Sequence, residues 1–97
     1  MSAPSQLDAW LAQEEEVLAR INAGVGVGVS RPEQVAGKSG LELMQAMLRG
    51  ELPFPPIAQT LDFQLLEASE GRAVFQGRPG PAHLNPMGGI HGGWYAT

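Results

Sequence analysis

The sequence has no cysteine, few basic residues and no long apolar run. Without cysteine, the chain forms no disulfide framework and no zinc site of the cysteine type. Its 97 residues include six Lys or Arg and ten Asp or Glu, giving a net charge of −4, and the basic residues stand singly. Nucleic acids and anionic membranes bind clustered basic residues, so we expect neither as a partner. No window approaches the roughly 20 apolar residues of a membrane span.

The first residues also lack the features of a secretion signal. Met1 to Gln6 are uncharged and contain neither a basic region nor a continuous apolar stretch. Together with the absent cysteines, this predicts a cytoplasmic protein. The length allows one domain at most, with a modest core that carries the fold unless other chains help.

Region 1–38 is predicted to hold an N-terminal helix and a glycine-rich linker. Apolar residues recur at spacings of three, four and seven from Leu7 to Ile21, which places them on one face of a helix. Ser5 and Asp8 resemble a capping box at its start, and the residues up to Gly24 provide a stop signal. The following Gly-Val repeat is too rich in glycine for a stable strand, so we expect a flexible connector.

A second helix is predicted from Ser39, with Glu42 at the capping-box position and Gly50 at its end. The segment 52–56 is Leu-Pro-Phe-Pro-Pro, which proline restricts to a stiff extended connector.

Two strand-like runs follow, Thr60–Ala68 and Arg72–Gly77. They are separated by a short segment in which Gly71 supplies the positive φ of a tight reversal. Their alternating side chains predict an antiparallel hairpin with one half-buried face. We expect Asp62 to lie within the first strand and to face solvent.

Residues 83–97 contain two histidines, one asparagine and four glycines, a composition typical of a loop whose backbone comes close to another group. Gly92 and Gly93 leave their amides accessible to a ligand. If a helix begins here, these amides are among its unpaired first-turn donors, and the helix dipole adds partial positive charge. Such donors stabilise developing negative charge, as an oxyanion hole does in acyl transfer.

This segment resembles the hotdog-fold acyl-CoA thioesterases of the phenylacetate-degradation type. The family pattern is an asparagine-proline pair, a turn of small residues and then His-Gly-Gly opening a central helix, here Asn85-Pro86 and His91-Gly92-Gly93. The preceding helix, proline-rich link and hairpin occur in the same order, so the likeness covers residues 39–97. It implies an α+β hotdog fold, in which an antiparallel sheet wraps a central helix, and makes 39–97 the N-terminal portion of a thioesterase domain.

The resemblance also implies roles for individual residues. The Gly92 amide would polarise the thioester carbonyl, His91 would position that carbonyl or shape the pocket, and Asn85 would orient the attacking water or the acyl group. A helix cap is the alternative role for His91, a turn residue is the alternative for Asn85, and His83 is expected to be structural. The residues expected to bind substrate are Met87, Gly88, Gly93 and Trp94.

No metal or redox cofactor is implied, and coenzyme A enters only as part of the acyl-CoA or aryl-CoA substrate. The likeness also implies a homo-oligomer, either a dimer or a dimer of dimers. The carboxylate that acts in this family is expected a few residues past Thr97, so the chain is expected to be the N-terminal part of a longer protein. One alternative is a non-catalytic acyl-CoA-binding or oligomerisation module of the same fold. A dehydratase acting on hydroxyacyl thioesters ranks below both.

Overall fold

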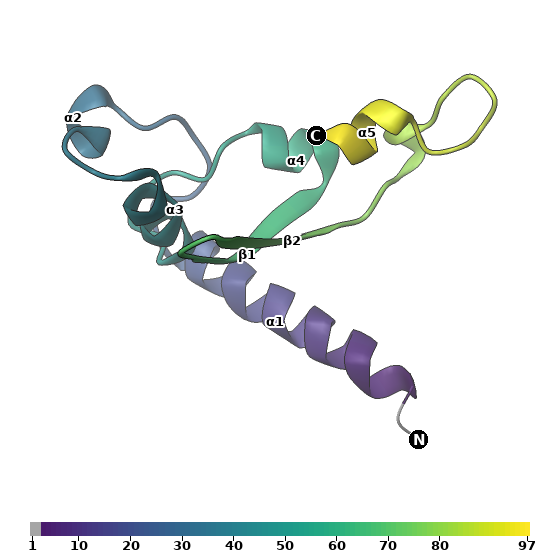
Figure 1. Ribbon diagram of the computed structural model, residues 1–97, viewed down its shortest axis with the longest axis horizontal. Coiled ribbons are helices and arrows are strands. Elements are labelled where there is room, and N and C mark those ends of the chain that lie inside the picture. The colour runs from purple at the N-terminus through teal and green to yellow at the C-terminus, as the bar shows by residue number, and fades with distance from the viewer. Residues whose placement is uncertain (1–2) are drawn as a thin grey trace.

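The computed structural model describes residues 3–97 and has an α+β architecture, as the sequence predicted. Its sheet in these residues is the antiparallel pair of β1 (Phe63–Ser69) and β2 (Arg72–Gly77), with helices on both sides (Figure 1). The Cα radius of gyration is 15.2 Å, compared with about 12.5 Å for a compact domain of this length. The chain is therefore open, with a small core and broad exposed faces. The elements are α1 (Ala3–Ala23), α2 (Pro32–Val35), α3 (Gly40–Leu48), α4 (Ile57–Leu61), β1 (Phe63–Ser69), β2 (Arg72–Gly77), a 3-10 turn (Pro81–His83) and α5 (Gly92–Ala96).

Helix α1 is the longest element, and half of its apolar face is covered. Val17 and Ile21 are buried, whereas every residue from 5 to 12 is exposed. The helix ends at Ala23, as predicted, but it begins at Ala3. The predicted cap at Ser5 is therefore wrong, because Ser5 already lies inside the helix.

The ends of α1 and α3 cross with their backbones in contact. Val25 N–H donates to the Gly50 carbonyl at 3.0 Å. A Cβ on Gly24 would lie 2.1 Å from the Gly50 oxygen. Gly50 has a φ of +77°, which confirms it as the residue that ends α3.

The Gly-Val segment after this crossing is held by hydrogen bonds, in contrast to the flexible connector that we predicted. Val27 forms a parallel bridge with Phe54 of the proline-rich segment. Phe54 N–H donates to the Gly26 carbonyl at 2.8 Å, and Gly28 N–H donates to the Phe54 carbonyl at 2.9 Å. Two segments that both lack regular structure thus satisfy each other's backbone groups.

The capping box of α3 is confirmed. Glu42 N–H donates to Ser39 Oγ at 3.1 Å, and Ser39 N–H donates to Glu42 Oε1 at 3.0 Å. Hydrogen bonds from the backbone and then the side chain of Ser39 hold the pKa of Glu42 below its ordinary value. This carboxylate is therefore in its capping form at neutral pH.

The predicted hairpin is confirmed over Arg72–Gly77, but its first strand begins later than expected. Residues 57–61 form α4, which starts directly after Pro56, so the predicted Thr60–Ala68 strand is shortened to β1. Asp62 ends α4 in the left-handed region, with a φ of 51°. Its expected place within a strand is therefore wrong. The preceding prolines favour the first turn of α4. The prediction of an extended connector over residues 52–56 did not include this role.

The core lies where α1, α4 and β1 meet. A bulge in β1 between Leu65 and Glu67 turns neighbouring leucines inward, so both are buried. The cluster contains residues from both sides of the division predicted at residue 38. That division remains a prediction. The buried cluster consists of Val17, Ile21, Phe54, Ala58, Leu65 and Leu66.

Among residues 3–97, no helix has both the length and the apolar character needed to cross a membrane.

Candidate functional site

After β2 the chain forms a loop that is closed by the side chain of Asn85. Asn85 Oδ1 accepts from Met87 N–H at 2.9 Å and from Gly89 N–H at 3.0 Å. The backbone N–H of Asn85 donates to the Gly89 carbonyl at 2.7 Å. Gly88 has a φ of +86°, which this tight reversal requires. The carbonyl oxygen of the Asn85 side chain is therefore used inside its own loop, and the side-chain NH₂ is the group left to meet a ligand.

His91 caps α5, which begins at Gly92. Gly93 N–H donates to His91 Nδ1 at 2.8 Å, so the amide of Gly93 is already occupied. Because Nδ1 accepts a hydrogen bond, the ring proton is assigned to Nε2. A Cβ on Gly92 would meet nothing within 4 Å. The Gly92 N–H has no acceptor within residues 3–97.

His83 joins three parts of the site. Its Nδ1 accepts from Gly80 N–H at 2.8 Å, and its Nε2 lies 2.9 Å from the Thr60 carbonyl. Its own carbonyl accepts from His91 N–H at 2.8 Å. These bonds tie the start of α5 to α4, in keeping with the structural role expected of His83.

Trp94 holds α5 against the rest of the fold. Its indole Nε1 donates to the Leu61 carbonyl at 2.6 Å. A Cβ on Gly77 would lie 2.9 Å from the Trp94 ring and 3.2 Å from Phe63 Cβ. The indole therefore packs directly on the β2 backbone at a position where any side chain would displace it.

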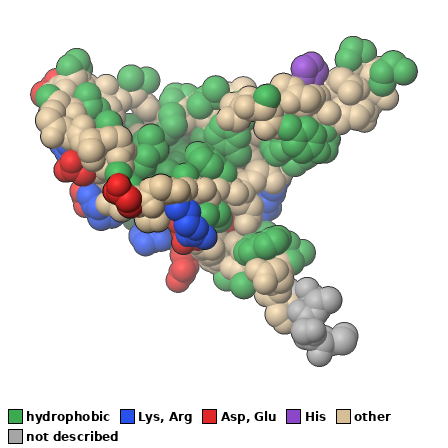
Figure 2. Space-filling view, viewed as in Figure 1, with side chains coloured by type: hydrophobic (Ala, Val, Ile, Leu, Met, Phe, Trp, Pro, Cys, Tyr) green, Lys and Arg blue, Asp and Glu red, His purple; other side chains and the backbone are tan. Residues whose placement is uncertain are grey.

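Two hollows lie on either side of Trp94. The smaller, of about 220 Å³, is next to the start of α5, and the larger, of about 370 Å³, lies between α5 and the hairpin. Hydrophobic side chains gather over the C-terminal segment, with a histidine beside them (Figure 2). The smaller hollow is lined by Leu61, Ala82, His83, Leu84, His91, Gly93 and Trp94, and the larger by Phe63, Phe75, Gly77, Trp94, Tyr95 and Thr97.

The larger hollow has aromatic walls. Phe63 and Phe75 have ring centroids 5.8 Å apart at an interplanar angle of 77°, and Trp94 and Tyr95 have centroids 5.4 Å apart at 81°. Both pairs have the edge-to-face geometry that aromatic rings favour. Phe75 and Tyr95 are 58% and 67% exposed, so this apolar surface is open to a ligand or another protein.

The structure brings together His91, Gly93 and Trp94 at the smaller hollow, with Gly92 between them in the chain. Asn85, Met87 and Gly88 line neither hollow. Met87 lies in the exposed loop and is 92% exposed. The sequence reasoning missed the contributions of Leu61, Phe63 and Phe75, which lie far from the glycine motif along the chain. Only their apolar alternation in the hairpin region could have pointed to the last two.

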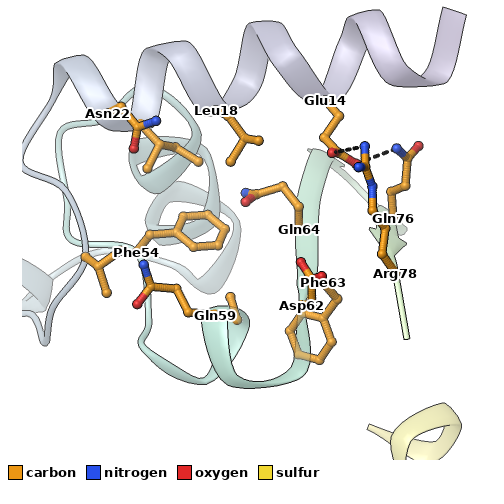
Figure 3. Close-up of a pocket in the computed structure, with 13 residues that line it drawn as sticks. Glu14, Leu18, Asn22, Phe54, Gln59, Asp62, Phe63, Gln64, Gln76 and Arg78 are labelled. Carbon is orange, nitrogen blue, oxygen red and sulfur yellow. Dashed lines mark hydrogen bonds and ion pairs between the residues drawn. The ribbon is translucent and has the colours of Figure 1, made fainter. Parts of the chain in front are cut away.

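A third hollow lies between α1 and the hairpin (Figure 3). Glu14 reaches over it to Arg78, with an Oε1–Nη2 distance of 2.6 Å. Its volume is about 160 Å³, below the roughly 300 Å³ at which small-molecule sites begin. Of these three hollows only the larger one beside Trp94, of about 370 Å³, exceeds this volume, and the smaller one beside Trp94 is the hollow that adjoins His91 and Gly93.

Comparisons with protein-family models, curated proteins and solved structures find no match to this chain.

Proposed function

We propose that this chain is part of a hotdog-fold thioesterase that hydrolyses acyl-CoA or aryl-CoA esters. The observation that carries the proposal is the Gly92 N–H at the start of α5, which has no acceptor within residues 3–97. In this proposal the amide polarises the thioester carbonyl and stabilises the oxyanion formed when water attacks.

The neighbouring residues support this arrangement. The His91 ring holds the Gly93 amide and so fixes the turn that presents Gly92. Because His91 also lines the smaller hollow, its Nε2–H is a second donor for the carbonyl oxygen. The aromatic hollow on the other side of Trp94 would receive the acyl or aryl group.

The proposed reaction needs a base. Water adds its oxygen to the carbonyl carbon while a carboxylate takes the proton; the carbon–sulfur bond then breaks, and the coenzyme A thiolate leaves and is protonated. Neither hollow beside Trp94 has an acidic lining residue. We therefore propose that the carboxylate comes from outside these linings, in an assembly of two or four copies.

Replacing Gly92 with proline tests the oxyanion role. Proline removes the N–H and is well tolerated at the first position of a helix, and His91 has the extended conformation (ψ 133°) that a residue before proline prefers. We expect kcat to fall about 10²- to 10³-fold, the usual cost of one oxyanion donor. The measurement is release of free thiol from a panel of acyl-CoA and aryl-CoA esters by the protein that contains this chain.

Gly92→Ala is the matched control, because it keeps the N–H and its Cβ has open space. It should retain most of the activity. If Gly92→Pro folds and turns over as fast as Gly92→Ala, the amide does not act on the carbonyl.

Asn85→Asp separates the two parts of that side chain. Aspartate keeps the oxygen that accepts from the loop amides but loses the NH₂. If Asn85 orients water or the acyl group through its NH₂, kcat should fall by up to about 10²-fold, the cost of a misplaced reactant, while the thermal midpoint changes little. Full activity in Asn85→Asp would limit Asn85 to holding the loop.

A non-catalytic acyl-CoA-binding module is the second candidate, favoured by the absence of an acidic residue from both linings. Calorimetric titration with a CoA ester, run beside the thiol assay, separates the two functions. Binding without thiol release identifies the module, and thiol release identifies the enzyme.

A further inference from the structure

The third hollow, between α1 and the hairpin, is built into the core of the fold. Its lining comes from α1, the Gly-Val segment, Phe54, α4 and the hairpin, and no lining residue follows Arg78 in the chain. Ile21, Phe54 and Ala58 line it and also belong to the buried cluster. The walls of this hollow are therefore the residues that pack these elements together.

The size of the third hollow limits what it can hold. Its volume is about 160 Å³, and a cavity of about 150 Å³ in another protein admits benzene. An acyl-CoA ester is far larger. The third hollow therefore suits an organic molecule with one ring, and its apolar side chains, among them Leu18, Ile21 and Phe54, suit an apolar body.

The hydrogen-bond donors at the edge of this hollow are already used. Gln76 Nε2 donates to Glu14 Oε2 at 2.5 Å, and Arg78 Nη2 donates to Glu14 Oε1 at 2.6 Å (Figure 3). The Glu14 side chain is 12% exposed, and each of its oxygens accepts one of these bonds. The one basic side chain of the lining is therefore committed to Glu14.

The Gln64 carboxamide leaves an acceptor in the hollow. Its Nε2 donates to the Leu65 carbonyl at 3.1 Å, which assigns the two ends of the amide. Its Oε1 accepts no hydrogen bond from residues 3–97. In Figure 3 the carboxamide points from β1 towards Leu18 and Phe54. A ligand that enters the hollow therefore meets this oxygen.

Asp62 adds a negative charge beside that acceptor. Its backbone is held in the left-handed region, with a φ of 51°, and its carbonyl accepts from Arg78 N–H at 2.8 Å. Its carboxylate belongs to none of the ion pairs formed within residues 3–97, and in Figure 3 it points towards Gln64. Because Arg78 balances only Glu14, the lining has an excess of one negative charge.

We propose that the third hollow binds a small organic cation, an ammonium or amidinium group on an apolar body no larger than a benzene ring. The ring packs among the apolar walls, and the cationic N–H groups donate to the Asp62 carboxylate and to Gln64 Oε1. Such charge-assisted hydrogen bonds are stronger than neutral ones. Asn85, His91 and Gly92 do not line this hollow, so the inference is independent of the proposed thioesterase activity.

The test compares three ligands of nearly equal size in saturation-transfer NMR titrations of the protein that contains this chain. Benzylamine is a cation at neutral pH, benzyl alcohol is its neutral counterpart, and benzoate is an anion. We expect a Kd of roughly 0.1–1 mM for benzylamine, as suits about eight non-hydrogen atoms. Benzyl alcohol should bind about tenfold more weakly and benzoate more weakly still.

Asp62→Asn removes the charge and keeps the backbone, because asparagine also adopts the left-handed region. It should raise the Kd of benzylamine about tenfold and leave that of benzyl alcohol unchanged. Glu70→Gln is the matched control, since it removes the same charge from an exposed turn residue outside the lining. It should leave both affinities unchanged. Leu18→Trp, which fills the hollow, should abolish the binding of both ligands.

Four results overturn the proposal. They are the absence of saturable binding at about 10 mM benzylamine, benzoate binding as tightly as benzylamine, an unchanged benzylamine affinity in Asp62→Asn, and an equal loss in Glu70→Gln. Retained binding in a folded Leu18→Trp variant would place the ligand elsewhere and also overturn it. Circular dichroism checks the fold of each variant, and the comparison of Asp62→Asn with Glu70→Gln decides the matter if Leu18→Trp unfolds.

Discussion

Gly24→Ala is expected to lower the free energy of unfolding by about 3 kcal/mol, at the upper end of the usual cost of overpacking. The added Cβ would lie 2.1 Å from the Gly50 oxygen and 2.6 Å from the Gly50 Cα, both backbone atoms. No rotation of a side chain relieves such a contact. The ends of α1 and α3 must separate, which also breaks the bond from Val25 N–H to the Gly50 carbonyl.

Urea unfolding followed by far-ultraviolet circular dichroism measures this loss. Gly40→Ala is the control, because Gly40 lies at the start of α3 and a Cβ there would meet nothing within 4 Å. It should leave stability unchanged or raise it slightly, since alanine is the better helix former. Equal midpoints for the two variants would mean that the crossing is looser than the structure describes.

Phe54→Ala is expected to cost about 3–5 kcal/mol, the usual range for removing a buried aromatic ring. The Phe54 ring is 5% exposed and packs in the cluster that joins α1, α4 and β1. The same residue forms the backbone bridge to the Gly-Val segment. Its loss leaves a cavity where three elements meet, and the core has few other large residues to fill it.

Ile57→Ala is the matched control for Phe54→Ala. Ile57 is three residues away and also apolar, but it is 52% exposed. It should lose less than about 1 kcal/mol, as surface substitutions usually do. Similar losses in Ile57→Ala and Phe54→Ala would show that the core does not centre on Phe54.

Local signals predicted the parts of this fold that local contacts determine. Ser39 and Glu42 bond within one turn of helix, and Gly71 has the positive φ of its two-residue reversal, so the sequence alone identified both. Helix α4 was missed because prolines that exclude a helix interior also favour a helix start. The contact of Gly24 with Gly50 was not predictable, since it depends on the approach of two helix ends that are separate in sequence.

In the candidate site, too, the local features were predicted from the sequence and the long-range contacts were not. The glycine-rich motif predicted a loop that leads into a helix, and His91 and Gly92 lie at that junction. The motif did not reveal that Asn85 uses its oxygen within the loop or that Met87 lies away from both hollows. The walls formed by Phe63 and Phe75 come from a hairpin that only the folded chain brings beside Trp94.

The bond between Glu14 and Arg78 also has a consequence for biosynthesis. The two residues are 64 positions apart, and α1 is made first. At a synthesis rate of about 5–20 residues per second, the ribosome needs roughly 3–13 seconds to reach Arg78 after Glu14. During that interval Val17 and Ile21 have no hairpin to cover them. The apolar face of α1 is therefore exposed in the nascent chain for several seconds, during which a chaperone that binds this helix would protect it from aggregation.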